Sequence, residues 1–251
     1  MPEATSFDSI DALCQQARAN FRTHSSRKQK EIDAVLTLCF EVVRSISKLK
    51  TPDEWKDSRE EATLAVLFQS IETVLAMHYL SESGFWDNAL VLKRNFSELL
   101  LIAIAIGFDQ QCFIDWKHER PNFDSFERIY KRVEQSSNVP EIEKSLLPHL
   151  KRYWSESSQL FSHNISRKSI RTLVKDGQIH FEPKSASADF QEKRMNTIRN
   201  MLLDLVSILL GIFQYDKRTF ERRADFPEAP GIISRCNECF QNHVWKSEKT
   251  T

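Results

Sequence analysis

Residues 86–107 have the sequence WDNALVLKRNFSELLLIAIAIG. The stretch is apolar nearly all the way round a helix, and it is too long for an ordinary strand. A helix that is apolar on every side has to be buried, so we predict that it forms the central helix of the fold. Gly107 is the kind of residue that commonly follows a helix, and we expect the helix to end there.

This apolar helix carries the charged residues Arg94 and Glu98. They lie four positions apart and therefore project from the same face. Because a buried charge is costly unless it is paired, we expect both to be buried and hydrogen-bonded to residues of the 153–167 region. They form either a site with His163, which titrates near neutral pH, or an ion pair that fixes the helix register.

Composition favours a helical protein. The chain has 251 residues, enough for one large domain, and 41% of them are hydrophobic, which is enough for a sizeable core. It contains only 5 Gly, whereas turn-rich β proteins use Gly frequently. The composition therefore predicts an all-α fold.

Helical spacing of apolar residues recurs along the chain, and Asp176-Gly177 suits the tight turn of a β-hairpin. Since the long helices need one another to bury their apolar faces, we predict a single antiparallel helical bundle over residues 1–251, with a small β-hairpin insertion near 172–181. The expected helices are 6–23, 31–49, 57–80, 85–106, 125–135, 140–162 with a bend at Pro148, 189–215 and 232–245, the first and last being peripheral.

Charge and cysteine usage indicate the compartment. Lys plus Arg equals Asp plus Glu, 35 each, so no global attraction to nucleic acid or anionic membrane is expected. The N-terminal residues lack the pattern of a secretory signal, and the most apolar runs, 99–108 and 201–213, are shorter than a membrane span. The 5 Cys, an odd number, suit free thiols. We expect a soluble cytoplasmic protein without membrane contact.

A polar and basic cluster follows the 140–162 helix. With Tyr153 it offers a docking site for a phosphate or a nucleic-acid backbone; the alternative is a solvated loop whose cations complement the helix end. The nearby aromatic residues Tyr153, Trp154 and Phe161 would either stack bases or belong to the core. The candidate ligand-binding residues are Tyr153, Asn164, Arg167, Lys168 and Arg171.

The C-terminal part contains Cys236, Cys239 and His243. These residues are weak candidates for a zinc site, because a structural zinc normally takes a fourth ligand and the same spacing is one face of a short helix. The sequence holds no Gly-rich phosphate loop, no Gly-x-Ser-x-Gly and no His-Glu-x-x-His. We therefore expect neither a metal nor a cofactor.

The segment 92–99, LKRNFSEL, resembles the Arg-x-x-x-Glu helix of a group of uncharacterised prokaryotic helical proteins. Their pattern continues with a helix that contains Tyr and Ser and ends in His, then an irregular or hairpin segment and a final apolar helix. Here the matching positions are Tyr153, Ser157 or Ser158, His163, the hairpin around Gly177 and the helix 195–213. The resemblance covers residues 65–215.

These proteins are distantly similar to the HEPN superfamily of helical bundles, some of which are ribonuclease toxins or defence effectors. Active HEPN ribonucleases carry a His shortly after the Arg, whereas Arg94 is followed by Glu98 and apolar residues. The resemblance thus implies a HEPN-like protein that binds a partner or an anionic ligand, in defence or stress response. The alternatives are an RNA-cleaving or other hydrolytic enzyme that uses Arg94, Glu98 and His163, and a structural protein that forms a homodimer.

Overall fold

The computed structural model describes scattered positions between residues 12 and 47, and residues 51–83, 85–159, 174–175, 178–179 and 188–214. Almost all of these residues are helical, which confirms the all-α class. The helices are α2 (Pro52–Trp55), α3 (Arg59–Glu82), α4 (Trp86–Phe108), α5 (Gln110–Lys117), a 3-10 turn η1 (Pro121–Phe123), α6 (Phe126–Gln135), α7 (Glu141–Lys144), α8 (Leu147–Gln159) and α10 (Ala188–Gln214).

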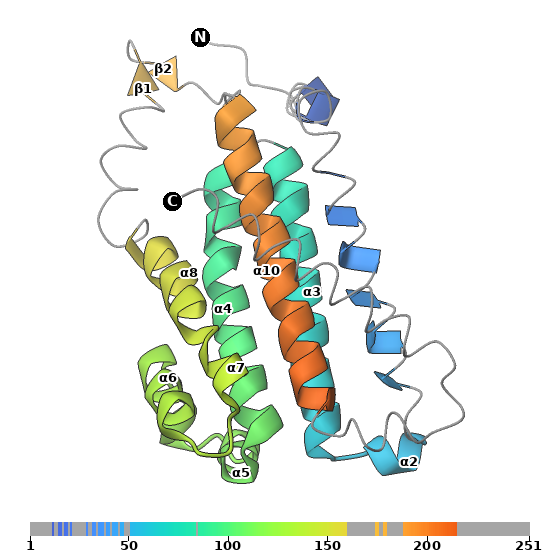
Figure 1. Cartoon of the computed structure of the whole chain (residues 1–251). Helices are drawn as coiled ribbons and strands as arrows, with labels where there is room; N and C mark the ends of the chain where they lie inside the picture. The colour runs from blue at the N-terminus through green and yellow to red at the C-terminus, as the bar shows by residue number, and fades with distance from the viewer. Residues whose placement is uncertain are drawn as a thin grey trace.

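Helix α4 is the centre of the described fold. It contacts α3, α5, α6, α8 and α10, and Figure 1 shows α3 and α10 alongside it, with α8 and α6 on the other side. Helices α4 and α10 run in the same direction, and α3 runs in the opposite one. The prediction that residues 86–107 form the central helix is confirmed, because residues 103–108 are buried all the way round.

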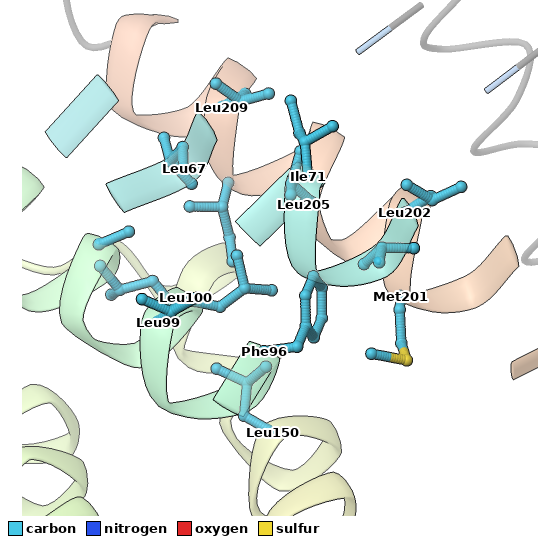
Figure 2. Close-up of a cluster of buried hydrophobic side chains, with 14 of the residues drawn as sticks. Leu67, Ile71, Phe96, Leu99, Leu100, Leu150, Met201, Leu202, Leu205 and Leu209 are labelled. Atoms are coloured by element: carbon cyan, nitrogen blue, oxygen red, sulfur yellow. The ribbon is translucent and has the colours of Figure 1, made fainter. Parts of the chain in front are cut away.

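The core lies where α3, α4, α8 and α10 meet. Figure 2 shows its side chains pointing toward one another from these four helices. Full burial of each large aliphatic side chain contributes about 1.5–3 kcal/mol, so this cluster is the main source of stability. Its labelled members are Leu67, Ile71, Phe96, Leu99, Leu100, Leu150, Met201, Leu202, Leu205 and Leu209.

Two glycines allow the helices to approach closely. A Cβ on Gly107 would lie 2.8 Å from Ile212 Cδ1, and a Cβ on Gly211 would lie 1.8 Å from Glu143 Oε1. Helix α4 ends at Phe108, next to Gly107 as expected, but Gly107 is itself helical and gives α10 room to pack. Space between helices, rather than backbone conformation, explains both glycines.

The predicted helix 140–162 is two helices within the described range. Helix α7 ends at Lys144 and α8 begins at Leu147, so the break precedes Pro148. Pro148 then lies in the first turn of α8, where the backbone N–H that proline lacks has no helical partner to lose.

Two short strands, β1 (Val174–Lys175) and β2 (Gln178–Ile179), pair antiparallel with Val174 opposite Ile179. The turn at 176–177 and the flanking residues 160–173 and 180–187 lie outside the described residues. The hairpin insertion as a whole, and its packing on the helices, therefore stay a prediction.

The described positions between 12 and 47 are helical, and their buried apolar side chains belong to the core. The predicted helix 6–23 lies partly outside the described residues, and the predicted helix 232–245 lies wholly outside them. Among the described helices, α3 alone has the length and hydropathy of a membrane span, and half of that window is buried in the fold.

Candidate functional site

Arg94 and Glu98 form the predicted pair, but at the surface. Arg94 Nε donates to Glu98 Oε1 over 2.9 Å, and the Arg94 side chain is 47% exposed. The prediction that both are buried is wrong. Only the second half of α4 is buried nearly all the way round. In its first half, one side of the helix is exposed to solvent, and this side includes Arg94 and the apolar Val91.

Trp154 of α8 joins this pair. Its Nε1 donates to Glu98 Oε1 over 2.9 Å, which confirms the predicted hydrogen bond to the 153–167 region. The Arg94 guanidinium lies 5.2 Å from the centre of the Trp154 ring, and the Phe126 ring stacks on Trp154 at 4.9 Å and an interplanar angle of 10°. Glu98, Trp154 and Phe126 thus hold an exposed arginine in one orientation.

The buried cation of α4 is Lys93, one residue before Arg94. Its side chain is 5% exposed, its ammonium pairs with Glu156 of α8, and the nitrogen lies 4.9 Å from the centre of the Tyr153 ring. Burial lowers the pKa of Lys93, and the bond to Glu156 opposes that change. Lys93 was not among the predicted site residues, although it lies within a turn of Ala89, Leu90 and Phe96 on the inner side of the helix.

A second buried polar group connects α8 to α10. The Tyr153 hydroxyl donates to Asp204 Oδ2 over 3.0 Å, and His149 Nδ1 lies 3.7 Å from Asp204 Oδ1. Burial raises the pKa of Tyr153, and the interaction with Asp204 raises the pKa of His149, which is 50% exposed. Tyr153 is buried, so of the two alternatives for its ring, stacking on bases or a place in the core, the structure shows the core position. The sequence could have indicated a partner for Asp204, because a lone carboxylate in an apolar helix needs a hydrogen-bond donor.

A third cluster anchors α5 to α6. Asp115 is buried and accepts hydrogen bonds from Arg132 at 2.6 Å, Arg120 at 3.0 Å and Gln111 at 2.9 Å. The bond from Arg132 is the main reason that the pKa of Asp115 lies below its usual range. Both carboxylate oxygens are bonded to neighbouring side chains, so the cluster joins α5 to α6.

The remaining predicted site residues lie outside the described residues: His163, Asn164, Arg167, Lys168 and Arg171, and the zinc candidates Cys236, Cys239 and His243. Phe161, one of the aromatic residues considered for base stacking, is outside them too. Over the described part of the chain, no group of three or more His, Cys, Asp or Glu side chains is placed to hold a metal ion.

A small cavity lies between α3, α4 and α10, beside Ser81, Lys93 and Arg194. Its volume of about 10 Å³ accommodates roughly one water molecule. Pockets for nucleotides or metabolites measure about 300–1,000 Å³, so this cavity is not a site for such ligands.

Helices α4 and α8 together present the exposed Arg94, Arg152 and Glu156 and the half-buried Glu98 and Trp154. We call these five residues the α4–α8 face. Arg152 pairs with Glu156 at 3.8 Å, as Arg94 pairs with Glu98, so cations and anions alternate on this surface. It has no excess of positive charge. Family models, curated proteins and solved structures contain no match to this chain.

Proposed function

We propose that this protein is a non-catalytic, HEPN-like helical bundle with a hairpin insertion, and that it binds an acidic group of a partner protein at the α4–α8 face. Its role would be in the cytoplasm, in defence or stress response. The observation that carries the proposal is the exposed Arg94, which Glu98 and Trp154 hold in place.

Arg94 has donors to offer. Its hydrogen bond to Glu98 uses Nε, so both terminal nitrogens are without a bonded partner among the described residues. A guanidinium held in one orientation loses little entropy when it binds, and its paired donors match the two oxygens of a carboxylate. Arg and Trp are also the residue types that most often dominate the energy of protein interfaces.

The charges of the α4–α8 face favour a protein over a nucleic acid. Arg94, Arg152 and the neighbouring Lys151 each have a carboxylate within 4.0 Å. Nucleic-acid binding depends on an excess of cations that neutralises successive phosphates, and this face has as many carboxylates beside its cations. A single acidic group needs only the terminal nitrogens of Arg94. The chain as a whole carries no net charge to compensate.

The test is crosslinking in cells with the full-length protein, its Arg94→Glu variant and an Arg128→Glu control. Arg128 of α6 is likewise exposed, and it is paired to a carboxylate four residues earlier in the chain, that of Asp124. Partners crosslinked to the wild type and to Arg128→Glu, and lost with Arg94→Glu, are the expected result. Equal recovery with both variants would contradict the proposal, and thermal melts would show that both variants are folded.

Two alternatives have their own readouts. Cleavage of RNA that disappears with His163→Ala would identify a hydrolytic enzyme that uses Arg94, Glu98 and His163. A stable homodimer whose interface contains Arg94, measured by light scattering of the wild type and Arg94→Glu, would identify the structural dimer.

A further inference from the structure

Helix α3 has a second apolar face that the described fold leaves uncovered. Three of the large exposed apolar side chains of the described residues lie on it: Phe68 at 42%, Leu75 at 36% and Tyr79 at 57% exposure. Ala65 and Glu72, also exposed, complete the row. We call Ala65, Phe68, Glu72, Leu75 and Tyr79 the α3 stripe.

The spacing within the α3 stripe alternates three and four residues, from 65 to 68, 72, 75 and 79. This is the spacing with which a helix packs along another helix, with side chains of one inserted between those of its partner. The opposite side of α3 is already used, because Val66, Ser70 and Met77 are buried in the fold. The α3 stripe is therefore a helix-packing face that the described residues leave exposed, apart from a contact with Arg18 at its Tyr79 end.

The charges on α3 indicate the chemistry of the missing helix. Arg59, the first residue of α3, is its only Lys or Arg, whereas Glu60, Glu61, Glu72 and Glu82 are acidic. Glu72 stands at the middle of the α3 stripe. In an antiparallel two-fold pair of identical stripes, Glu72 would face the same residue of the other copy, and like charges there are destabilising.

The Tyr79 end of the α3 stripe already binds a cation from this chain. The Arg18 guanidinium lies 4.6 Å from the centre of the Tyr79 ring, and it also donates to the Tyr79 hydroxyl. This contact shows that a guanidinium and the exposed surface of α3 are compatible.

We infer that the α3 stripe is a docking site for a basic amphipathic helix of a partner protein, with apolar residues between Phe68, Leu75 and Tyr79 and a Lys or Arg opposite Glu72. This site is distinct from the α4–α8 face, because α3 and α8 lie on different sides of α4 (Figure 1). The inference therefore does not depend on the proposed function.

The probe is a displayed library of amphipathic helical peptides with Leu at each packing position and one randomised position at the centre. It is selected against the full-length wild type and its Glu72→Lys, Phe68→Ser/Leu75→Ser and Val91→Ser variants. Val91 is a matched control, since it is equally exposed but lies on α4. All substituted residues are exposed, and thermal melts confirm folding of each variant.

Against the wild type and Val91→Ser, we expect Lys and Arg at the randomised position to be enriched about tenfold over Glu and Asp, the ratio that about 1.4 kcal/mol produces. Glu72→Lys should reverse the preference, and Phe68→Ser/Leu75→Ser should abolish enrichment. Enrichment independent of residue 72, or none against the wild type, would overturn the inference. Two other results would also overturn it: self-association of the wild type, or its binding to vesicles of phosphatidylcholine and phosphatidylglycerol, if the Phe68→Ser/Leu75→Ser variant no longer shows that behaviour.

Discussion

Lys93 and Arg94 are consecutive residues of α4, yet the side chain of Lys93 is 5% exposed and that of Arg94 is 47% exposed. Successive residues of a helix point about 100° apart, so one step along the chain separates the core from the surface. Each cation has a carboxylate partner, Glu156 for Lys93 and Glu98 for Arg94. The two pairs should therefore differ in their contribution to stability.

Glu156→Ala should destabilise the fold more than Glu98→Ala. Without Glu156, the buried Lys93 loses its partner, at a cost of about 1–2 kcal/mol, which is below that of a fully buried pair because Glu156 is half exposed. Loss of Glu98 breaks a surface pair and should cost about 1 kcal/mol or less. Chemical denaturation of the two variants and of Lys93→Met/Glu156→Ala measures the difference. A double variant as unstable as Glu156→Ala would show that the pair is not coupled.

Tyr153→Phe should destabilise the protein by about 1–3 kcal/mol, because the Asp204 carboxylate would lose its donor in a buried place. Tyr130→Phe is the control: Tyr130 packs on Phe126, and its hydroxyl donates to no described residue. Thermal melts that gave equal losses for both variants would rule out a special role for the Tyr153–Asp204 bond.

The stability of the protein should depend on His149 and pH. Because Asp204 raises the pKa of His149 in the folded state, protonation of His149 stabilises the fold. That contribution is fully present below the ordinary pKa of 6.5 and is lost as the pH rises through the folded-state pKa. The difference in free energy of unfolding between wild type and His149→Gln should thus shrink from pH 5.5 toward pH 8.

His78 provides the opposite case within the same protein. Burial lowers the pKa of His78, so the neutral side chain is the form that the fold favours. The contribution of His78 to the free energy of unfolding is therefore present above pH 6.5 and is lost as the pH falls through the folded-state pKa. The difference between wild type and His78→Gln should therefore grow with rising pH. Parallel pH slopes for the two variants would contradict this assignment.

Gly211→Ala should destabilise the fold by about 1–3 kcal/mol, since the new methyl group would overlap the buried Glu143 carboxylate. Truncating the partner should relieve the overlap, so Gly211→Ala/Glu143→Ala should be more stable than the sum of the two single changes predicts. Urea denaturation of the four proteins gives the coupling, and additive losses would show that the two residues do not meet.

The purified protein should not cleave RNA. No His follows Arg94 in the position found in active HEPN ribonucleases, and Glu98 is bonded to Arg94 and Trp154. Any binding of labelled single-stranded RNA should be weak and steeply salt-dependent, because Arg167, Lys168 and Arg171 offer backbone charge without base recognition. Titrations at low and physiological salt test this, with His163→Ala and a variant lacking the three charges as controls. Salt-resistant, sequence-selective binding would contradict it.

The candidate site was predictable only in part. The spacing of Arg94 and Glu98 on one helix face is a local property, and it indicated their pairing correctly. The hydrogen bond from Trp154 to Glu98 was expected only as a contact with some residue of the 153–167 region. The prediction that Arg94 and Glu98 are buried was wrong. Lys93 was missed, since which side of a helix faces the core depends on the helices packed against it.

By itself, the sequence determined the helical class and the central position of the helix at residues 86–107. These follow from propensity and from the period of apolar residues, both of which act within a few residues. Tertiary structure alone decided that Lys93 is buried, that Asp204 meets Tyr153 from 51 residues away and that Gly107 accommodates Ile212. Those contacts depend on how helices distant in the sequence approach each other, which no local pattern specifies.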